Sequence, residues 1–350
     1  MTIILAIETS CDETSAAVVE NGQTIRSNVV ASQIDIHRRY GGVFPEVASR
    51  QHILTITTVI QDAMVQARTQ WNDLDAVAVT HGPGLAGSLL VGVNAAKGIA
   101  LALNRPLIGV NHLEGHMVSN WLITDGPVPT PKFPALCLIV SGGHTELVLV
   151  HDHLAYEVLG RTLDDAAGEA FDKVGRLLGL GYPGGPAIGR AAEDATRHDR
   201  VFPRAWLGDS YDLSFSGLKT AARRIIAEAR ADAGLAATPE VPLRDDVVAE
   251  LAWGFEDAVV DVLATKTMRA ARAIGARSIV VGGGVAANSA LRARLAGEAD
   301  DLRRPLIVPR PALCTDNGAM IGAAGARRFA LGERSGLDLD ARPSLPLAAR

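Results

Sequence analysis

Hydrophobic and polar positions follow two different periods along the chain. Short apolar runs bounded by Gly, Pro or Asp are typical of strands, and such runs occupy residues 3–8, 16–20, 76–80, 107–110, 135–140, 146–150, 278–281 and 305–308. Apolar residues recur at helical spacing in residues 45–69, 88–104, 169–179, 216–232, 245–274, 288–298 and 317–332. Because predicted strands and helices alternate, we expect an α/β architecture in which helices cover mixed sheets.

A strand–turn–strand pattern occurs near the start of each half of the chain. Residues 6–19 are AIETSCDETSAAVV, and the same order returns at residues 137–150 as CLIVSGGHTELVLV. The repetition predicts a duplicated fold with a central cleft between two lobes, residues 1–130 and 131–316, with the Pro-rich stretch 126–133 at their boundary. We expect the helix at 317–332 to pack back on the first lobe and residues 333–350 to form a flexible tail.

The composition is that of a folded intracellular protein. The 350 residues correspond to about two domains, and 48% of them are hydrophobic, which excludes global disorder. No run of 18 apolar residues occurs, and Glu8 comes too early for a signal peptide, so we expect a cytoplasmic protein that does not enter membranes. Cys11, Cys137 and Cys314 form no CxxC pair, which excludes a zinc ribbon or a disulfide framework.

The charge balance argues against a general basic field that would hold nucleic acid, because the formal net charge is −5. A polynucleotide substrate would need a local basic patch or help from a partner. Two sets of arginines could contact phosphates, although a solvated surface is the commoner role for such residues. They are Arg38, Arg39 and Arg50 in the first half, and Arg303, Arg304 and Arg310 near the C-terminus.

Three glycine-rich turns could hold a phosphorylated ligand. SGGH (141–144) and VGGGVAAN (281–288) follow predicted strands, and YPGGP (182–186) follows a predicted helix. Backbone N–H groups at such turns can approach an anion closely, but tight turns alone also explain them. Neither the P-loop nor the dinucleotide-binding spacing is present. Asp172, before the third turn, is a candidate acceptor for ligand hydroxyls or an ordinary helix carboxylate.

The sharpest chemical feature is NHLEGHMVSN (111–120), in which His112 and His116 are four residues apart. On a helix this spacing puts both imidazoles on one face, where they can chelate a divalent ion. Asp316, within CTDNGAM, is either the third ligand or the N-cap of the following helix. Two His and one carboxylate leave open positions on the ion and suit Fe(II) or Zn(II).

A zinc peptidase is the obvious competitor, because its HExxH motif has the same His spacing. In this sequence Leu113 occupies the position of the general-base Glu. Glu114 projects roughly 200° from His112 around a helix, largely away from a metal. Peptidase chemistry therefore lacks its base.

Many motifs of the chain, taken in order, resemble a single family. They are IETSCDETS, FPEVASRQH, THGPGLAGSLLVG, NHLEGH, IVSGGHTEL, AAGEAFDKVGRLLGLGYPGGP, DLSFSGLKT, VGGGVAAN and CTDNGAM. Over about residues 3–329 they resemble the universal tRNA threonylcarbamoyladenosine transferase family, in its bacterial TsaD branch, long mislabelled as a sialoglycoprotein endopeptidase. The resemblance implies a two-lobed actin-like ATPase fold, related to sugar kinases and heat-shock chaperone ATPases.

The resemblance also implies an activity and its participants. The family transfers a threonylcarbamoyl group from threonylcarbamoyl-AMP to the exocyclic amine of the adenine beside the anticodon, in tRNAs that read codons beginning with A. Implied partners are a TsaB-like paralogue and a TsaE-like ATPase, with the donor made by a TsaC-type synthase. One divalent metal ion, Fe(II) before Zn(II), is implied at His112, His116 and Asp316. Adenylate-binding residues are implied at Ile139, Val140, Ser141, Gly142, Gly143, Asp172, Gly185 and Asn288.

Asp12 and Glu13, in the first polar turn, are our candidates for handling the amine proton by general-base catalysis or electrostatics. A pair of surface acids explains them equally well. The Ala/Arg-rich insert at 229–242 and the tail after Leu331 resemble the family less and receive no role. Two alternatives to a transferase remain, a metallopeptidase and a non-catalytic ATP-binding scaffold.

Overall fold

The computed structural model describes residues 1–123, 130–236 and 241–348. The chain forms two compact units, which we describe separately. Unit 1 comprises Met1–Pro131, Val150–Glu157 and Pro309–Arg350, and unit 2 comprises Lys132–Leu149 and Val158–Val308. Residues 126–129 of the predicted boundary and 237–240 of the insert lie outside the described residues.

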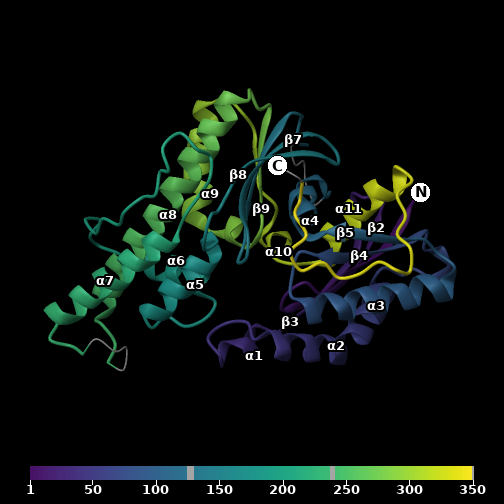
Figure 1. The fold of residues 1–350 in the computed structure, drawn as a ribbon, viewed down its shortest axis with the longest axis horizontal. Coiled ribbons are helices and arrows are strands. Elements are labelled where there is room, and N and C mark those ends of the chain that lie inside the picture. The colour runs from purple at the N-terminus through teal and green to yellow at the C-terminus, as the bar shows by residue number, and fades with distance from the viewer. Residues whose placement is uncertain (124–129, 237–240, 349–350) are drawn as a thin grey trace. The chain divides into compact units, whose positions relative to one another are not determined.

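The elements follow the predicted alternation of strands and helices (Figure 1). The first half of the chain contributes β1 (Ile3–Glu8), β2 (Glu13–Glu20), β3 (Thr24–Ser32), α1 (Ile34–Arg38), α2 (Pro45–Gln66), β4 (Ala76–Gly82), α3 (Ala86–Leu103), β5 (Leu107–Asn111) and α4 (His112–Val118). The second half contributes β6 (Ala135–Val140), β7 (Thr145–Asp152), β8 (Ala155–Arg161), α5 (Ala167–Leu177), α6 (Gly184–Glu193), α7 (Ser216–Asp232), α8 (Asp245–Ala273), β9 (Ser278–Gly282), α9 (Ser289–Asp301), β10 (Leu306–Ile307), α10 (Pro311–Cys314) and α11 (Gly318–Ala330).

Within the described residues the strands form two five-stranded sheets of matching order. The first is β3-β2-β1-β4-β5, and the second is β8-β7-β6-β9-β10. In the first sheet, β1 pairs antiparallel with β2 and parallel with β4. The strand–turn–strand repeat seen in the sequence therefore corresponds to β1–β2 and β6–β7, which confirms the predicted duplication and the α/β class.

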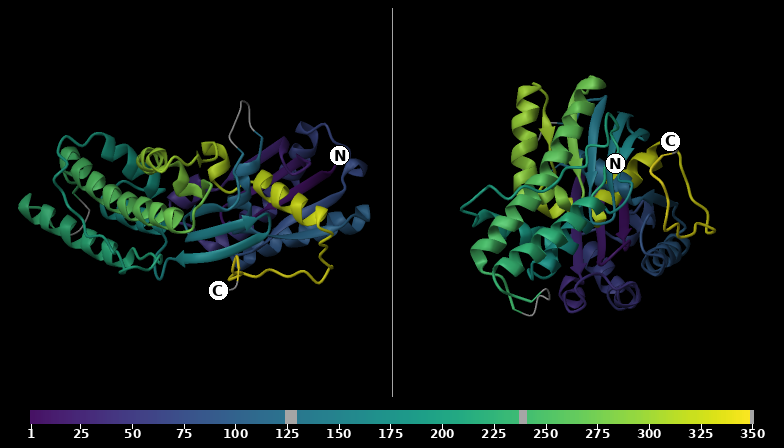
Figure 2. Two further views of the ribbon diagram at one scale, coloured as in Figure 1. Left: turned by 90° about the horizontal axis from the view of Figure 1, so that it is seen from above. Right: turned by 60° about the vertical axis from the view of Figure 1, so that its left-hand side comes forward.

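The sheet of unit 1 is covered on both faces. Residues alternate between faces along β1, so that Leu5 and Ile7 pack in one hydrophobic cluster with residues of α2 and α3. Ile4 and Ala6 pack in the opposite cluster with residues of α11. In Figures 1 and 2 the yellow helix α11, the dark purple α2 and the blue α3 flank the strands. Burial of both faces explains why β1 is a continuous apolar run.

Unit 2 is organised around the long helix α8, which contacts α6 and α9. Phe255 of α8 lies edge-on to Phe171 of α5 and to Phe202, with ring centroids 5.4 and 6.2 Å apart. The buried Lys266 of α8 donates hydrogen bonds to the carbonyls of Ser210 and Asp212. These contacts hold α5 and α6, which carry two of the predicted ligand-binding residues.

The edge strands β3 and β8 and the helix α6 are among the elements that were not predicted. β3 and β8 each lie at the edge of a sheet, and both mix polar with apolar residues because they are only partly buried. α6 begins at Gly184 with the sequence GGPAIG, whose glycines and proline resemble a turn. In each case local composition was overridden by tertiary contacts.

The segment after Leu331 is not the loose tail expected from its sequence. Its backbone bonds to the edge strand β5, where Ser335 N–H donates to the carbonyl of Leu107 at 2.8 Å. Farther along, Arg342 N–H donates to the carbonyl of His81 at 2.7 Å. Leu339 packs against the core cluster shared with α2 and α3. The tail is held by backbone groups of the edge strand β5 and of the end of β4, which explains why it needs no apolar stripe.

Among the described helices, only α3 has the length and apolar composition of a membrane-crossing segment. Leu89, Val93 and Ala96 on its inner face are buried. Val93 and Ala96 belong to the core cluster of unit 1. Core packing therefore accounts for the apolar character of that face of α3.

The tail contact can be tested with two leucines of the same segment. Leu339→Ala should lower the free energy of unfolding by about 1–2 kcal/mol, because it removes apolar contacts with the core. Leu337, which is 52% exposed, is the matched control, and Leu337→Ala should change stability little. Urea unfolding of both variants measures the difference. Equal destabilisation would contradict the observed packing.

Candidate functional site

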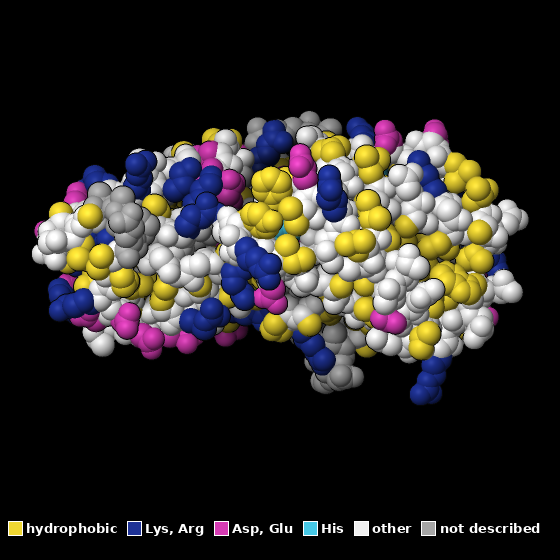
Figure 3. All heavy atoms as spheres, turned by 90° about the horizontal axis from the view of Figure 1, so that it is seen from below, with side chains coloured by type: hydrophobic (Ala, Val, Ile, Leu, Met, Phe, Trp, Pro, Cys, Tyr) yellow, Lys and Arg dark blue, Asp and Glu magenta, His cyan; other side chains and the backbone are white. Residues whose placement is uncertain are grey.

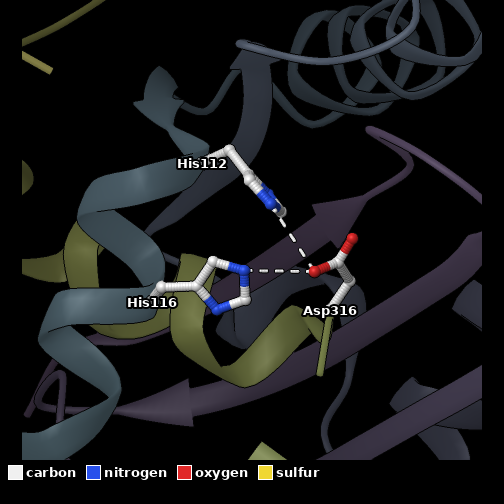
Figure 4. A group of neighbouring side chains, drawn as sticks. All are labelled: His112, His116 and Asp316. Atoms are coloured by element: carbon white, nitrogen blue, oxygen red, sulfur yellow. Dashed lines mark ion pairs between the residues drawn. The ribbon is translucent and has the colours of Figure 1, made fainter. Parts of the chain in front are cut away.

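The structure brings His112, His116 and Asp316 together in unit 1 (Figure 4). Their ligand atoms all lie within 4.8 Å of one another. Asp316 Oδ1 is 3.1 Å from His116 Nε2 and 3.5 Å from His112 Nε2. Ligand atoms around a tetrahedral Zn²⁺ are separated by roughly 3.4 Å, since each bond is about 2.1 Å. The group therefore has the dimensions of a single metal site.

Helix α4 sets the geometry of the two histidines. It starts directly after β5, where the side chain of Asn111 accepts a hydrogen bond from Leu113 N–H at 2.9 Å and caps the helix. The i, i+4 spacing then brings the imidazoles to a centroid distance of 4.6 Å. Both rings are buried.

Asp316 lies in the connection between α10 and α11. The sequence left open whether it caps α11, and the structure gives that role to Asn317, whose Oδ1 accepts from Met320 N–H at 3.0 Å. Helix α11 lies close to the sheet, because a Cβ at Gly318 would be 2.7 Å from the backbone nitrogen of Ala17. This close packing fixes the start of α11, and with it Asp316, against β2.

A residue that the sequence analysis missed orients one of the histidines. Glu8, fully buried at the end of β1, accepts hydrogen bonds from Thr80 Oγ1 at 2.6 Å and from Ser10 N–H. Its Oε2 lies 3.0 Å from His112 Nδ1, which leaves Nε2 directed at Asp316. A carboxylate on the far nitrogen of a histidine is the usual support of a metal ligand. The only signal in the sequence was a charge at the end of an apolar strand.

The electrostatics around His112 are dominated by carboxylates. Burial alone would lower the pKa of His112, but the charges of Asp316 and Glu8 outweigh it and raise the pKa to about 9. The fully buried His116 makes no hydrogen bond through Nδ1 among the described residues, and its Nε2 has only the ion-pair contact with Asp316. A cation bound between Nε2 and Asp316 would lower the free-energy cost of burying these polar atoms. The three residues thus fit a divalent ion.

The polar turn between β1 and β2 carries the candidate acids. Asp12 is buried, and Glu13 accepts a hydrogen bond from Ser32 Oγ at 3.1 Å. Burial raises the pKa of Glu13 well above its ordinary value, and the negative charges of Asp12 and Asp316 add to this effect. The turn therefore shares the electrostatic environment of the His/His/Asp group. A carboxyl with a raised pKa is suited to proton transfer.

A chain of hydrogen bonds, most of them buried, supports the turn between β1 and β2 through the carbonyl of Cys11. Phe44 N–H donates to His37 Nδ1 at 3.3 Å, and His37 Nε2 lies 3.1 Å from Gln33 Oε1. Gln33 Nε2 lies 3.4 Å from His52 Nδ1, and His52 Nε2 lies 3.0 Å from the carbonyl of Cys11. Because burial lowers the pKa of His52, this ring is neutral near pH 7 and donates through Nε2. The chain connects α1 and α2 to the acid-bearing turn.

The predicted adenylate-binding residues all belong to unit 2. Ile139 and Val140 are buried at the end of β6, whereas Gly142 and Gly143 are exposed and have open space where a Cβ would stand. Helix α5 starts against this turn, since a Cβ at Gly168 would be 2.6 Å from the carbonyl oxygen of Ser141. The turn thus presents backbone groups beside a helix N-terminus.

The other predicted members make internal hydrogen bonds. Asp172 Oδ1 accepts from Gly184 N–H at 2.7 Å and so joins α5 to α6, next to Gly185. Asn288 caps α9 by accepting from Leu291 N–H at 2.8 Å. Its amide nitrogen donates to Glu256 Oε1 at 2.6 Å. Glu256 was not predicted, and nothing in its spacing marks it.

Glu114 points away from the metal group, as its helical position predicted. Its carboxylate lies between the two nitrogens of Arg328, at 3.0 Å from Nε and 2.5 Å from Nη2. A carboxylate held in this way by a guanidinium cannot act as the base of a zinc peptidase. The arginines considered for phosphate contacts are exposed at the surface of their units: Arg38, Arg39, Arg50, Arg303, Arg304 and Arg310.

The role of Glu8 predicts a pH effect on the metal-free protein. The folded-state pKa of His112, about 9, exceeds the ~6.5 of an unfolded imidazole. Its pairing therefore stabilises the fold fully below about pH 6.5, and this contribution is lost as pH rises through 9. Glu8→Gln removes one of the two negative charges that raise the pKa of His112. The loss of stability with rising pH should therefore begin at lower pH, and the free energy of unfolding at neutral pH should fall by on the order of 1–3 kcal/mol.

Urea unfolding of chelator-treated protein between about pH 6 and 10 measures this shift. Glu20→Gln is the control, because Glu20 pairs with Arg26 in a partly exposed bridge remote from the histidines. A Glu8→Gln profile parallel to that of the original protein would contradict the assignment.

Comparison with known proteins gives a consistent result. The family described as tRNA N6-adenosine threonylcarbamoyltransferase (TsaD) matches residues 24–323 of this chain. Proteins of that name from Thermomicrobium roseum and Dehalococcoides mccartyi are similar over nearly their whole length. The first is 54% identical over 359 residues, covering 99% of this chain and 98% of its own. The second is 53% identical over 346 residues, covering 99% of both.

Solved structures are similar at the level of fold. HypF from T. kodakarensis has a TM-score of 0.59 at 13% identity, covering 95% of this chain and 48% of its own. Component A of the (R)-2-hydroxyglutaryl-CoA dehydratase of Acidaminococcus fermentans has a TM-score of 0.51 at 13% identity, covering 94% and 100%. These likenesses confirm the predicted actin-like ATPase fold. With the family match over most of its length, the chain belongs to the tRNA N6-adenosine threonylcarbamoyltransferase family.

Proposed function

We propose that this chain transfers the threonylcarbamoyl group of threonylcarbamoyl-AMP to the exocyclic amine of the adenine beside the anticodon, in tRNAs that read codons beginning with A. The amine nitrogen forms a bond to the carbamoyl carbon, the bond from that carbon to the phosphate oxygen breaks, and AMP leaves. The amine loses one proton. The observation that carries the proposal is the His/His/Asp group in a chain whose relatives bear this name.

The group His112, His116 and Asp316 would hold one divalent ion, Fe(II) before Zn(II). When bound, such an ion supplies Lewis acidity toward the oxygens of the donor. The protein keeps Nε2 of His112 available for it by engaging Nδ1 with Glu8. The contact of His116 Nε2 with Asp316, and the charges of Asp316 and Glu8 that favour a cation beside His112, support the same assignment.

In unit 2, the turn at Ser141–Gly143, whose two glycines are exposed, would bind the phosphate of the adenylate through backbone N–H groups. Ile139 and Val140 hold this turn at the end of β6, and Asp172, Gly185 and Asn288 would line the nucleoside. In unit 1, Asp12 and Glu13 would take the amine proton or stabilise the charge that develops. The raised pKa of Glu13 supports this role.

The same proposal includes partners and a cytoplasmic location. A net charge of −5 gives little general attraction for tRNA, so help from a TsaB-like paralogue and a TsaE-like ATPase is expected, with the donor supplied by a TsaC-type synthase. Figure 3 shows hydrophobic side chains gathered on the surface of unit 1. On α2 and α3 the exposed apolar residues are Ile53, Leu54, Val65, Leu90 and Leu101. Such a surface is suited to a protein partner.

A transfer assay tests the proposal. The purified chain with its partners, the donor synthase, radiolabelled threonine, bicarbonate, ATP and unmodified tRNA should place label in tRNA. His112→Ala and Asp316→Ala should each lower the rate by about 100-fold or more, because the ion loses a ligand. His151→Ala is the control, since His151 is exposed on β7 and pairs with Glu157 instead of a residue of the triad. Elemental analysis of anaerobically purified protein distinguishes iron from zinc.

Each outcome of the assay decides between the alternatives. Full transfer activity of both His112→Ala and Asp316→Ala would contradict the assignment of these residues as metal ligands. No label with any preparation, together with ATP binding, would favour a non-catalytic scaffold. Cleavage of a glycoprotein by a metal-loaded, protease-free preparation would favour a peptidase, although Glu114 lacks the orientation for that chemistry.

A further inference from the structure

The ion pair between Glu114 and Arg328 joins the two helices that carry the metal-site residues. Glu114 belongs to α4 and is 1% exposed, and Arg328 belongs to the last turn of α11. The guanidinium donates through Nε and Nη2 to the two oxygens of one carboxylate. A two-point contact of this kind fixes orientation as well as distance.

The relative position of α4 and α11 controls the geometry of the candidate metal site. His112 and His116 lie on α4, and Asp316 lies two residues before the start of α11. A rotation of α4 about its axis, or a shift along α11, would move both imidazoles relative to Asp316. Asp316 Oδ1 is only 3.1 and 3.5 Å from the two imidazole nitrogens, so a displacement of about 1 Å would matter.

The helices also touch directly at Gly115, the residue that follows Glu114 in α4. A Cβ at Gly115 would be 2.8 Å from Ile321 Cδ1 and 3.1 Å from Met320 Cγ, both on α11. This contact sets the separation of the helices, but apolar packing against flexible side chains allows sliding. The ion pair with Arg328 supplies the directional restraint that packing lacks.

We propose that Glu114 and Arg328 are positioning residues for the metal ion, and that their ion pair holds α4 against α11 in the register that lets His112, His116 and Asp316 bind one cation. This inference rests on the proposed metal site. It is separate from the hydrogen bond of Glu8, which orients a single ring. It also gives a function to the Glu of the HLEGH motif, which is not available as a base.

The test measures metal affinity of the full chain, with Zn²⁺ titrated against a chromophoric chelator. Arg328→Met should weaken Zn²⁺ binding by roughly 10-fold, and Arg328→Lys, which keeps the charge but not the two-point contact, should weaken it less. Glu114→Gln should also weaken it. Removing a positive charge would by electrostatics alone tighten binding of a cation, so weaker binding in Arg328→Met reports a change of geometry.

Glu333→Gln is the matched control, because Glu333 pairs with the same guanidinium through Nη1 and does not touch α4. It should leave the affinity unchanged. Thermal unfolding of each variant shows whether it is folded. If Arg328→Met does not fold, Arg328→Lys replaces it in the affinity measurement. Lower stability with unchanged Zn²⁺ affinity in Arg328→Lys and Glu114→Gln would overturn the inference. If the original chain and His112→Ala bind Zn²⁺ equally well, the proposed metal site is contradicted, and not only the role of the Glu114–Arg328 ion pair.

Discussion

A carboxylate without access to solvent ends β1, and much of unit 1 is arranged to satisfy it. Burying such a charge costs several kcal/mol unless hydrogen bonds replace water. Glu8 obtains them from Thr80 on β4, from the backbone of Ser10 in the acid-bearing turn, and from His112 on α4. One buried charge thereby fixes the position of a strand, a turn and a helix relative to one another, and the candidate chemistry of unit 1 lies where these three elements meet.

The five residues HLEGH show how one short helix serves several structural requirements at once. Its histidines face Asp316, its Leu113 is buried, its Glu114 engages Arg328, and its Gly115 allows α11 to approach. The motif resembles that of a zinc peptidase only in the spacing of its histidines. Shifting the carboxylate by one position on a helix turns it by about 100°, which converts a base beside the ion into a support of the helix.

The sequence was most informative where one physical signal dominated. Interior strands such as β1 are buried on both faces and appear as apolar runs, and the long helices have clear periodicity. The edge strands β3 and β8 were missed because they are only partly buried and their composition is mixed. The three candidate ligands could be found from spacing and from resemblance to a family. Glu8 and Arg328 could not, since their roles depend on partners 104 and 214 residues away in the chain.

The end of the tail reaches the helix that carries the histidines. The carbonyl of Pro346 accepts a hydrogen bond from Asn111 Nδ2 at 3.0 Å, and the same amide caps α4 through its oxygen. Pro346 therefore helps to orient the Asn111 side chain that caps the first turn of α4. A fusion partner joined beyond Pro346 would therefore pull on the cap of α4, whereas one attached at the exposed Met1 would not, so purification tags and surface tethers are better placed at the amino end.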